Sequence, residues 1–286
     1  MKIIQEAFNS TLMSSLKAAY EHYYSKKISA SDVFGLSGMA FTTAYSKGLG
    51  PCAPYTFNMD GLKTLCKDNL GLSIMDEEFS VTSKSTKAEK IEATKNIKTF
   101  LDDGFLVLLN TYEVQLITGY NETHFITTNP WDAPSVTPDL KLDTLEGIKD
   151  FLLYSKIEKV NINHNDLEHK NVIKYALEQF TNIKTMDFIT QGIKAYDFLL
   201  DEINSDNAND LGMWWSSSVW SECKYCASKY VEEHYQDDEL TNFYKELGAI
   251  FDKLSNKEGQ LETKIEQIKL AKDLELKIEV HLKALI

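Results

Sequence analysis

The chain has 286 residues, of which 43% are hydrophobic and 11% aromatic, with 13 glycines and 5 prolines. This length and composition suit one large domain or two of ordinary size, and they exclude a disordered chain. The net charge of −13 gives no basic footprint for nucleic acid, and all 30 basic residues are lysines, so the bidentate phosphate grip of arginine is absent.

The N-terminal sequence MKIIQEAFNSTLMSSLK lacks the apolar core of a signal peptide. No run approaches the roughly 20 apolar residues of a membrane span. The 4 cysteines do not form a secreted disulfide framework. We therefore expect a cytoplasmic protein with no membrane partner, no nucleic-acid partner and no cofactor.

Helix and strand patterns alternate in the first part of the chain. Apolar residues at helical spacing predict a helix at 9–24, two short helices around a glycine break at 29–45, and helices at 59–70, 85–102 and 142–154. Apolar runs bounded by turn residues predict strands at 71–81, 105–110, 114–120, 124–129 and 157–162. These elements indicate an α+β domain over 1–163 with a small antiparallel sheet.

The second part of the chain is almost wholly helical in pattern. After a polar linker at 161–169, apolar stripes predict a bundle of about five helices that bury one another's faces. Their ranges are 171–180, 189–203, 211–234, 239–254 and 261–285. We expect the second domain, 164–286, to be an all-α helical bundle.

Three motifs of the first part occur in an order typical of one fold: FGLSGMAF, GFLVLLNTYEVQLITGYN and TTNPWD. This order resembles the papain-like fold of bacteriocin-processing cysteine peptidases. It resembles more narrowly the butirosin biosynthesis protein H group, which joins a papain-like half to a helical half. GIKAYDFLLDEI and WSECKYCASKYVEEH resemble helices of that second half, with Lys224 where arginine is more usual.

The resemblance implies a site that is altered at every position. Relatives carry a nucleophilic cysteine at the start of the first long helix. This chain has no cysteine there, and spacing favours Ser14 or Ser15 among residues 9–15. The relatives' histidine base aligns with Glu113, and their orienting aspartate aligns with Asn129. Loss of the thiolate, histidine and aspartate predicts loss of peptidase chemistry. A buried glutamate with a raised pKa could still act as a base.

Each candidate also has an ordinary structural interpretation. Ser14 and Ser15 suit helix capping and close packing, and an acid such as Glu113 at a strand start is usually solvated. His124 is expected at a hairpin edge, with a place in the same cleft as the alternative. The sequence NPWD is first a turn, although Asn129, Trp131 and Asp132 could line a cleft, with Asp132 as an alternative orienting acid.

The cysteines give no metal or redox signal. Cys52, in a glycine/proline loop, is a weak candidate for a reactive thiol, and Cys66 is expected in a helix core. Cys223 and Cys226 have the Cys-x-x-Cys spacing, but no second pair of ligands follows, so we expect core packing and no metal site.

Three functional hypotheses follow from the sequence. The first is a papain-like protein without peptidase activity that binds a peptide or a small acyl or amine ligand in the old cleft. The second is an acyltransferase or amide-bond enzyme of natural-product biosynthesis with an altered Ser/Glu/Asn site. The third is an oligomerising module, because the amphipathic C-terminal segment could pair with a copy of itself. An acidic chain favours cationic ligands.

Overall fold

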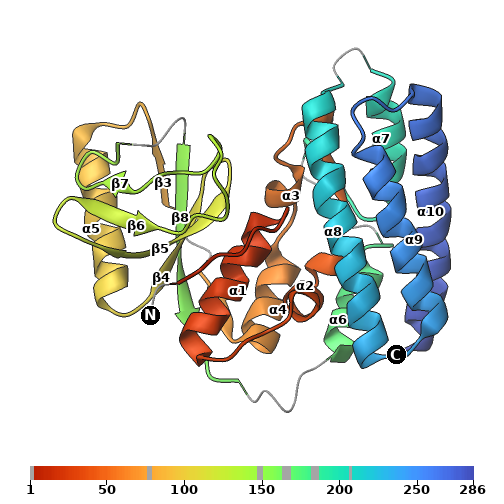
Figure 1. Cartoon of the computed structure of the whole chain (residues 1–286), viewed down its shortest axis with the longest axis horizontal. Coiled ribbons are helices and arrows are strands. Elements are labelled where there is room, and N and C mark those ends of the chain that lie inside the picture. Colours follow the sequence, from red (N-terminus) through yellow and green to blue (C-terminus); the bar gives the residue numbers. More distant parts are fainter. Residues whose placement is uncertain (1–2, 76–78, 147–150, 163–168, 182–186, 206–207) are drawn as a thin grey trace. The chain divides into compact units, whose positions relative to one another are not determined.

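The computed structural model describes all residues except 1–2, 76–78, 147–150, 163–168, 182–186 and 206–207. The chain forms two compact units (Figure 1). Unit 1 comprises Met1–Ile28 and Cys66–Asn163, and unit 2 comprises Ser29–Leu65 and His164–Ile286. The division expected from the sequence placed all of 1–163 in one domain. The structure instead assigns 29–65 to the helical unit.

Unit 1 is built on a seven-stranded antiparallel sheet in the described residues. Its order is β2-β8-β4-β5-β6-β7, and β3 also pairs with β8. The strands are β2 (Leu72–Ile74), β3 (Phe79–Thr82), β4 (Leu106–Asn110), β5 (Val114–Tyr120), β6 (His124–Thr127), β7 (Leu140–Lys141) and β8 (Phe151–Lys159). This sheet confirms the α+β class that the alternating sequence pattern predicts.

Helices cover the sheet of unit 1. Helix α5 (Lys87–Asp102) packs on β3, β4 and β5, and its Ile97 shares a core with Val107 of β4 and Ile117 of β5. Helix α1 (Thr11–Tyr24) packs on β5 and β2. Four consecutive residues of β4, 106–109, are buried, as expected for a strand covered on both faces.

Two sequence predictions in unit 1 need correction. The helix predicted at 142–154 is wrong, because its last residues begin β8 and residues 147–150 lie outside the described part. Leu142, Leu145 and Leu152 have helical spacing, but β8 pairs with strands on both sides, and those backbone hydrogen bonds outweigh local propensity. The strand predicted at 71–81 is two strands, which pair with successive parts of β8.

Unit 2 is a helical bundle organised around α8 (Asp210–His234). Helix α8 packs on α9 (Asp238–Leu254), α2 (Ala30–Leu36) and the short α3 (Ala53–Thr56), and α9 packs on α10 (Leu261–Ala284). The remaining elements are α6 (His169–Glu178), α7 (Lys194–Ile203), the first part of α4 (Asp60–Leu70), the 3-10 turns η1 (Met39–Phe41) and η2 (Lys47–Leu49), and the strand pair β1 (Ala44–Ser46) and β9 (Ile189–Gln191).

The segment 189–203 was predicted as one helix, and the structure divides it into β9 and α7. Gly192 between them has φ +71°, a left-handed conformation that ends the strand and that L side chains rarely adopt. The rest of the predicted bundle corresponds to α6, α8, α9 and α10. In the part of the chain that the structure describes, none of the helices has the length and apolar character needed to cross a membrane.

A buried ion pair lies inside the bundle. Lys224 of α8 is fully buried, and its Nζ lies 3.2 Å from Glu275 Oε1 and 3.3 Å from the carbonyl oxygen of Thr42, to which it donates. Tyr196 donates its hydroxyl to the same Glu275 oxygen at 2.9 Å. Because a buried charge must be paired, this contact fixes α7, α8 and α10 to one another.

Close backbone approach at the start of α8 yields a test of the fold. A Cβ added at Gly212 would lie 1.7 Å from the carbonyl oxygen of Leu49. Alanine is otherwise better than glycine in a helix by about 1 kcal/mol, so any loss of stability comes from this contact. We expect Gly212→Ala to lower the free energy of unfolding by about 2 kcal/mol or more in urea titrations followed by circular dichroism.

Gly119→Ala is the matched control, because its added Cβ meets nothing within 4 Å. An unchanged or higher stability for Gly212→Ala would contradict the packing described at the start of α8.

Candidate functional site

The N-terminus of α1 meets the start of β5 through a hydroxyl and a carboxylate. Thr11, the first residue of α1, donates its hydroxyl to Glu113 Oε2 at 3.0 Å and accepts the backbone N–H of Val114 at 3.0 Å. Thr11 is fully buried and Glu113 is 4% exposed. The positive end of a helix favours a carboxylate, so the local folding of α1 and the placement of Glu113 support each other.

Gln5 connects this pair to the rest of unit 1. Its buried amide Nε2 lies 3.1 Å from the carbonyl oxygen of Thr11, 2.8 Å from Ser14 Oγ and 2.9 Å from the carbonyl oxygen of Val114. Its Oε1 accepts a short hydrogen bond from the hydroxyl of Thr128. One side chain therefore joins α1, β5 and the end of β6.

The two serines favoured from the sequence bond elsewhere. Both are fully buried. Ser14 donates its hydroxyl to the carbonyl oxygen of Thr11 at 3.1 Å, and Ser15 donates its hydroxyl to the carbonyl oxygen of Val114 at 3.1 Å. The structure thus pairs Glu113 with Thr11, about one helical turn before the serines that spacing placed at the nucleophile position.

Burial governs the protonation of Glu113. Removal from water raises the pKa of its carboxyl group, and hydrogen bonds from Ser135 and Thr11 offset only part of that effect. A raised pKa is a property that a general base requires. The fully buried Thr11 hydroxyl, however, offers no exposed surface to a substrate.

A second glutamine closes the loop that follows β6. Gln115 donates from Nε2 to the carbonyl oxygens of Thr128 at 2.5 Å and Thr137 at 3.0 Å, and its Oε1 accepts the Thr137 N–H at 2.7 Å. The hydroxyl groups of Thr137 and Thr111 lie 2.8 Å apart. These bonds hold the loop 128–137, which contains the NPWD sequence, against β5.

Asn129 and Asp132, the residues predicted to orient a base, make none of the described hydrogen bonds to Gln5, Thr11 or Glu113. Asn129 and Asp132 are exposed, and Trp131 is half-buried. The neighbour of Asn129 contributes instead, because Thr128 accepts the N–H of Leu116 at 2.9 Å in addition to its bond with Gln5. The turn interpretation of NPWD agrees with the exposure of Asn129 and Asp132.

His124 lies at the far end of the β5–β6 hairpin from Glu113. The seven residues of β5 span roughly 23 Å at about 3.3 Å per residue, and His124 begins β6 after the turn. Its Nδ1 lies 2.8 Å from Thr123 Oγ1, and Asn121 Oδ1 accepts its backbone N–H at 2.8 Å. The hairpin-edge position expected from the sequence is observed.

The cysteines contribute no activated thiol to this network. Cys52 is exposed at the start of the four-residue helix α3 and belongs to unit 2. Burial raises the pKa of Cys226 to about 12 and raises that of Cys66 and Cys223 further. In the described residues, one cluster has a spacing that could hold a metal ion, formed by Asp32, Glu233 and His234. Cys223 and Cys226 are not part of it.

Sequence reasoning missed Gln5, Gln115 and Thr128 and considered Thr11 without selecting it. The available signal was a set of uncharged polar residues inside otherwise apolar segments. Such residues are hydrogen-bonded when buried, but the bonds from Gln5 to Val114 and from Thr11 to Glu113 join residues about a hundred positions apart along the chain. Comparison of the sequence with models of known protein families and with curated proteins found no match.

The Thr11 hydroxyl can be tested by a near-isosteric pair of substitutions. Thr11→Val leaves the Glu113 carboxylate and the Val114 N–H without this partner, whereas Thr11→Ser keeps the hydroxyl. We expect Thr11→Val to cost about 1–3 kcal/mol of unfolding free energy, measured in urea, and Thr11→Ser clearly less. Equal losses in the two variants would show that the methyl group, and not the hydrogen bonds, matters here.

The raised pKa of Glu113 predicts a pH dependence of stability. The folded state holds the Glu113 proton more tightly than the unfolded state, so this contribution is complete below the unfolded pKa and is lost as pH rises through the folded pKa. Wild type should therefore lose stability relative to Glu113→Gln as the pH rises above the ordinary glutamate pKa of about 4.3.

Glu89→Gln is the control for that experiment, because hydrogen bonds from Thr86 lower the pKa of the exposed Glu89. Its stability difference from wild type should change with pH in the opposite direction, since a lowered pKa stabilises the folded state above the unfolded pKa. A pH-independent difference for Glu113→Gln would contradict the burial argument.

Proposed function

We propose that this chain is a papain-like-fold protein of the butirosin biosynthesis protein H type that lacks cysteine peptidase activity and binds a peptide or a small acyl or amine ligand. The observation that carries the proposal is the buried contact between Thr11 and Glu113. A hydroxyl at the start of the first helix and a carboxylate at the start of β5 support it, because the resemblance assigns the thiol and imidazole of cysteine peptidases to this helix start and this strand start, with Thr11 one turn before the serines favoured by spacing.

The bonding of this contact supports a structural role. The Thr11 hydroxyl donates one hydrogen bond and accepts another, so its described partners already use it in both roles. The Gln5 amide, which could otherwise stabilise an oxyanion, has three acceptors near its two hydrogens. A peptidase would need these groups exposed to a carbonyl, whereas here they join α1 to the sheet.

The charge of the chain supports a cationic ligand. A net charge of −13 attracts amines and basic peptides over long range. An aminosugar or a lysine-rich peptide fits this field better than an acidic carrier protein does.

One observation favours the alternative, an acyltransferase or amide-bond enzyme. Burial raises the pKa of Glu113 beside a hydroxyl group, which is the pairing that a carboxylate base needs to activate an alcohol. In that version Glu113 would take the hydroxyl proton of Thr11 as the Thr11 oxygen attacks the thioester carbonyl, and the thiol would leave with that proton. The amine of the aminosugar would then take the acyl group from the ester and return the hydroxyl to Thr11. Turnover would then require the buried Thr11 to become accessible.

The two versions differ in one assay. The purified chain is incubated with a fluorogenic peptide, and separately with an acyl N-acetylcysteamine thioester plus an aminosugar, and products are followed by mass spectrometry. We expect no turnover of either donor, together with saturable binding of the aminosugar or of a lysine-rich peptide by calorimetry. Thioester consumption that Thr11→Val abolishes and Thr11→Ser retains would establish the enzyme instead, and absence of binding would refute the ligand proposal.

A further inference from the structure

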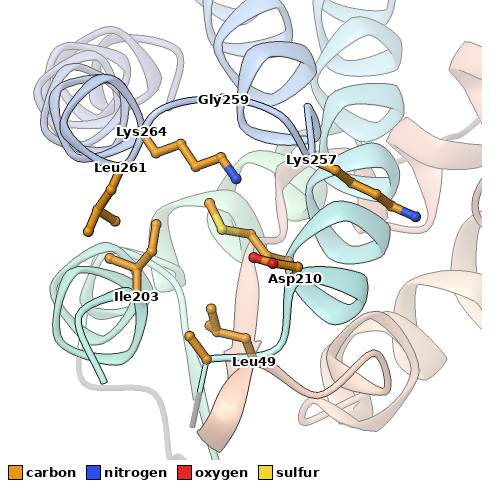
Figure 2. Close-up of a pocket in the computed structure, with 9 residues that line it drawn as sticks. Leu49, Ile203, Asp210, Lys257, Gly259, Leu261 and Lys264 are labelled. Carbon is orange, nitrogen blue, oxygen red and sulfur yellow. The ribbon is translucent and has the colours of Figure 1, made fainter. Parts of the chain in front are cut away.

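A pocket in unit 2 lies between the first turns of its two longest described helices. It has a volume of about 200 Å³ and is lined by α8, α10, the loop 255–260 and the end of η2. Leu49, Ile203 and Met213 supply apolar walls, and Asp210, Lys257 and Lys264 supply the charges. Figure 2 shows Lys264 entering the pocket from α10, with Asp210 on the side of α8. All of these residues belong to unit 2.

Lys264 distinguishes this pocket from an ordinary surface hollow. Its residue is 8% exposed, and its side chain runs into the centre of the pocket in Figure 2. Gly259 lets the lysine stem pass, because a Cβ there would lie 3.1 Å from Lys264 Cε. Within the described part of the chain, the Lys264 ammonium has no hydrogen-bond or ion-pair partner.

The other buried lysines of the described residues, Lys17 and Lys224, have the carboxylate partners that Lys264 lacks. Lys17, 7% exposed, lies 2.5 Å from a Glu6 oxygen and 2.7 Å from a Glu21 oxygen. Lys224, fully buried, has Glu275 at 3.2 Å. Each of them has a carboxylate at contact distance, as buried charges require. The Lys264 residue is buried to a similar degree, but its ammonium has no such carboxylate in the described residues and is not enclosed by protein, so it opens into the pocket.

The N-terminus of α10 adds positive electrostatic potential to that of Lys264. Helix α10 begins at Leu261, which lines the pocket, and its N-cap residue Gln260 makes no side-chain capping bond. The first N–H groups of this 24-residue helix therefore lack the capping acceptor that Asn209 provides to α8. Uncapped N–H groups at the positive end of a helix add to the attraction that Lys264 exerts on an anion.

The charges and size of the pocket limit the ligand. Two lysines and one aspartate give a net charge of +1 (2 − 1). Lys257 lies at the edge, with its Nζ 4.1 Å from the centre of the Trp214 ring, and Figure 2 shows it directed away from Lys264. Asp210 opposes a second negative charge, and the chain has no arginine for bidentate phosphate binding. A single carboxylate on a short apolar body matches these features better than phosphate.

We propose that this pocket binds a small monocarboxylate ligand, with the Lys264 ammonium as its counter-ion. An amino group on the ligand would use Asp210 as well, so a short amino acid is the preferred member of the class. This proposal concerns unit 2 alone and does not depend on the function proposed above.

The experiment measures binding of butyrate, 4-aminobutyrate and inorganic phosphate to the full chain by calorimetry and thermal shift. We expect saturable binding of both carboxylates, tighter for 4-aminobutyrate, and weaker binding of phosphate. Lys264→Met should weaken the binding of both carboxylates by about tenfold or more. Lys269→Met, which removes an exposed lysine of the same helix, should leave both affinities unchanged. Asp210→Asn should abolish the preference for 4-aminobutyrate while butyrate still binds.

Stability without ligand gives a second readout. The Lys264 stem is buried and its ammonium has no partner among the described residues, so replacement by an apolar side chain of similar length should keep or raise the thermal midpoint of the ligand-free protein. Lys264→Gln serves where Lys264→Met does not fold. The proposal is overturned if neither carboxylate binds saturably, if phosphate binds more tightly, if both Lys264 variants bind as wild type does, or if both lower the ligand-free midpoint as strongly as loss of a structural ion pair would.

Discussion

The hydrogen bond between Thr11 and Glu113 is the contact on which the arrangement of unit 1 depends. It lies where the first helix meets the central part of the sheet, and Gln5 extends it to β6. A buried hydroxyl, amide and carboxylate are tolerated only if each has a partner, so these residues fix the position of α1 far more narrowly than apolar contact would. The Thr11 hydroxyl already has partners in both of its hydrogen-bonding roles and is fully buried, so it offers no exposed surface to a substrate.

Unit 2 follows the same constraint with a different outcome. In its core, Glu275 forms an ion pair with Lys224 and accepts a hydrogen bond from Tyr196. These contacts fix α7, α8 and α10 to one another. At one end of the bundle, Lys264 is nearly as buried but has no counterpart in the described residues. A charge paired within the protein marks a structural cluster, whereas a charge without a partner in the protein marks a candidate ligand site.

The sequence predicted much of the architecture, because most elements carry a local signal. The helices at α1, α5, α8, α9 and α10 and the strands at β4, β5 and β6 lie close to their expected ranges, and their ends carry recognisable capping or turn residues. The helix predicted at 142–154 is wrong because its last residues belong to β8, whose pairing with β3 and β4 outweighs the helical spacing of the leucines. The predicted division at residue 163, which placed 29–65 in the first domain, differs from the structure for the same reason, since Gly35 packs on Tyr230, nearly two hundred residues away.

By itself the sequence determined the α+β class, the helical second part, the absence of a thiol in residues 9–15 and the place of Glu113 at the start of a strand. Each of these depends on composition or on residues close together along the chain. Only the tertiary structure decided that Thr11, rather than Ser14 or Ser15, meets Glu113, that Thr128 rather than Asn129 joins them, and that Lys264 is buried without a partner. Hydrogen bonds act over about 3 Å, and periodicity cannot fix the relative position of two elements to that distance.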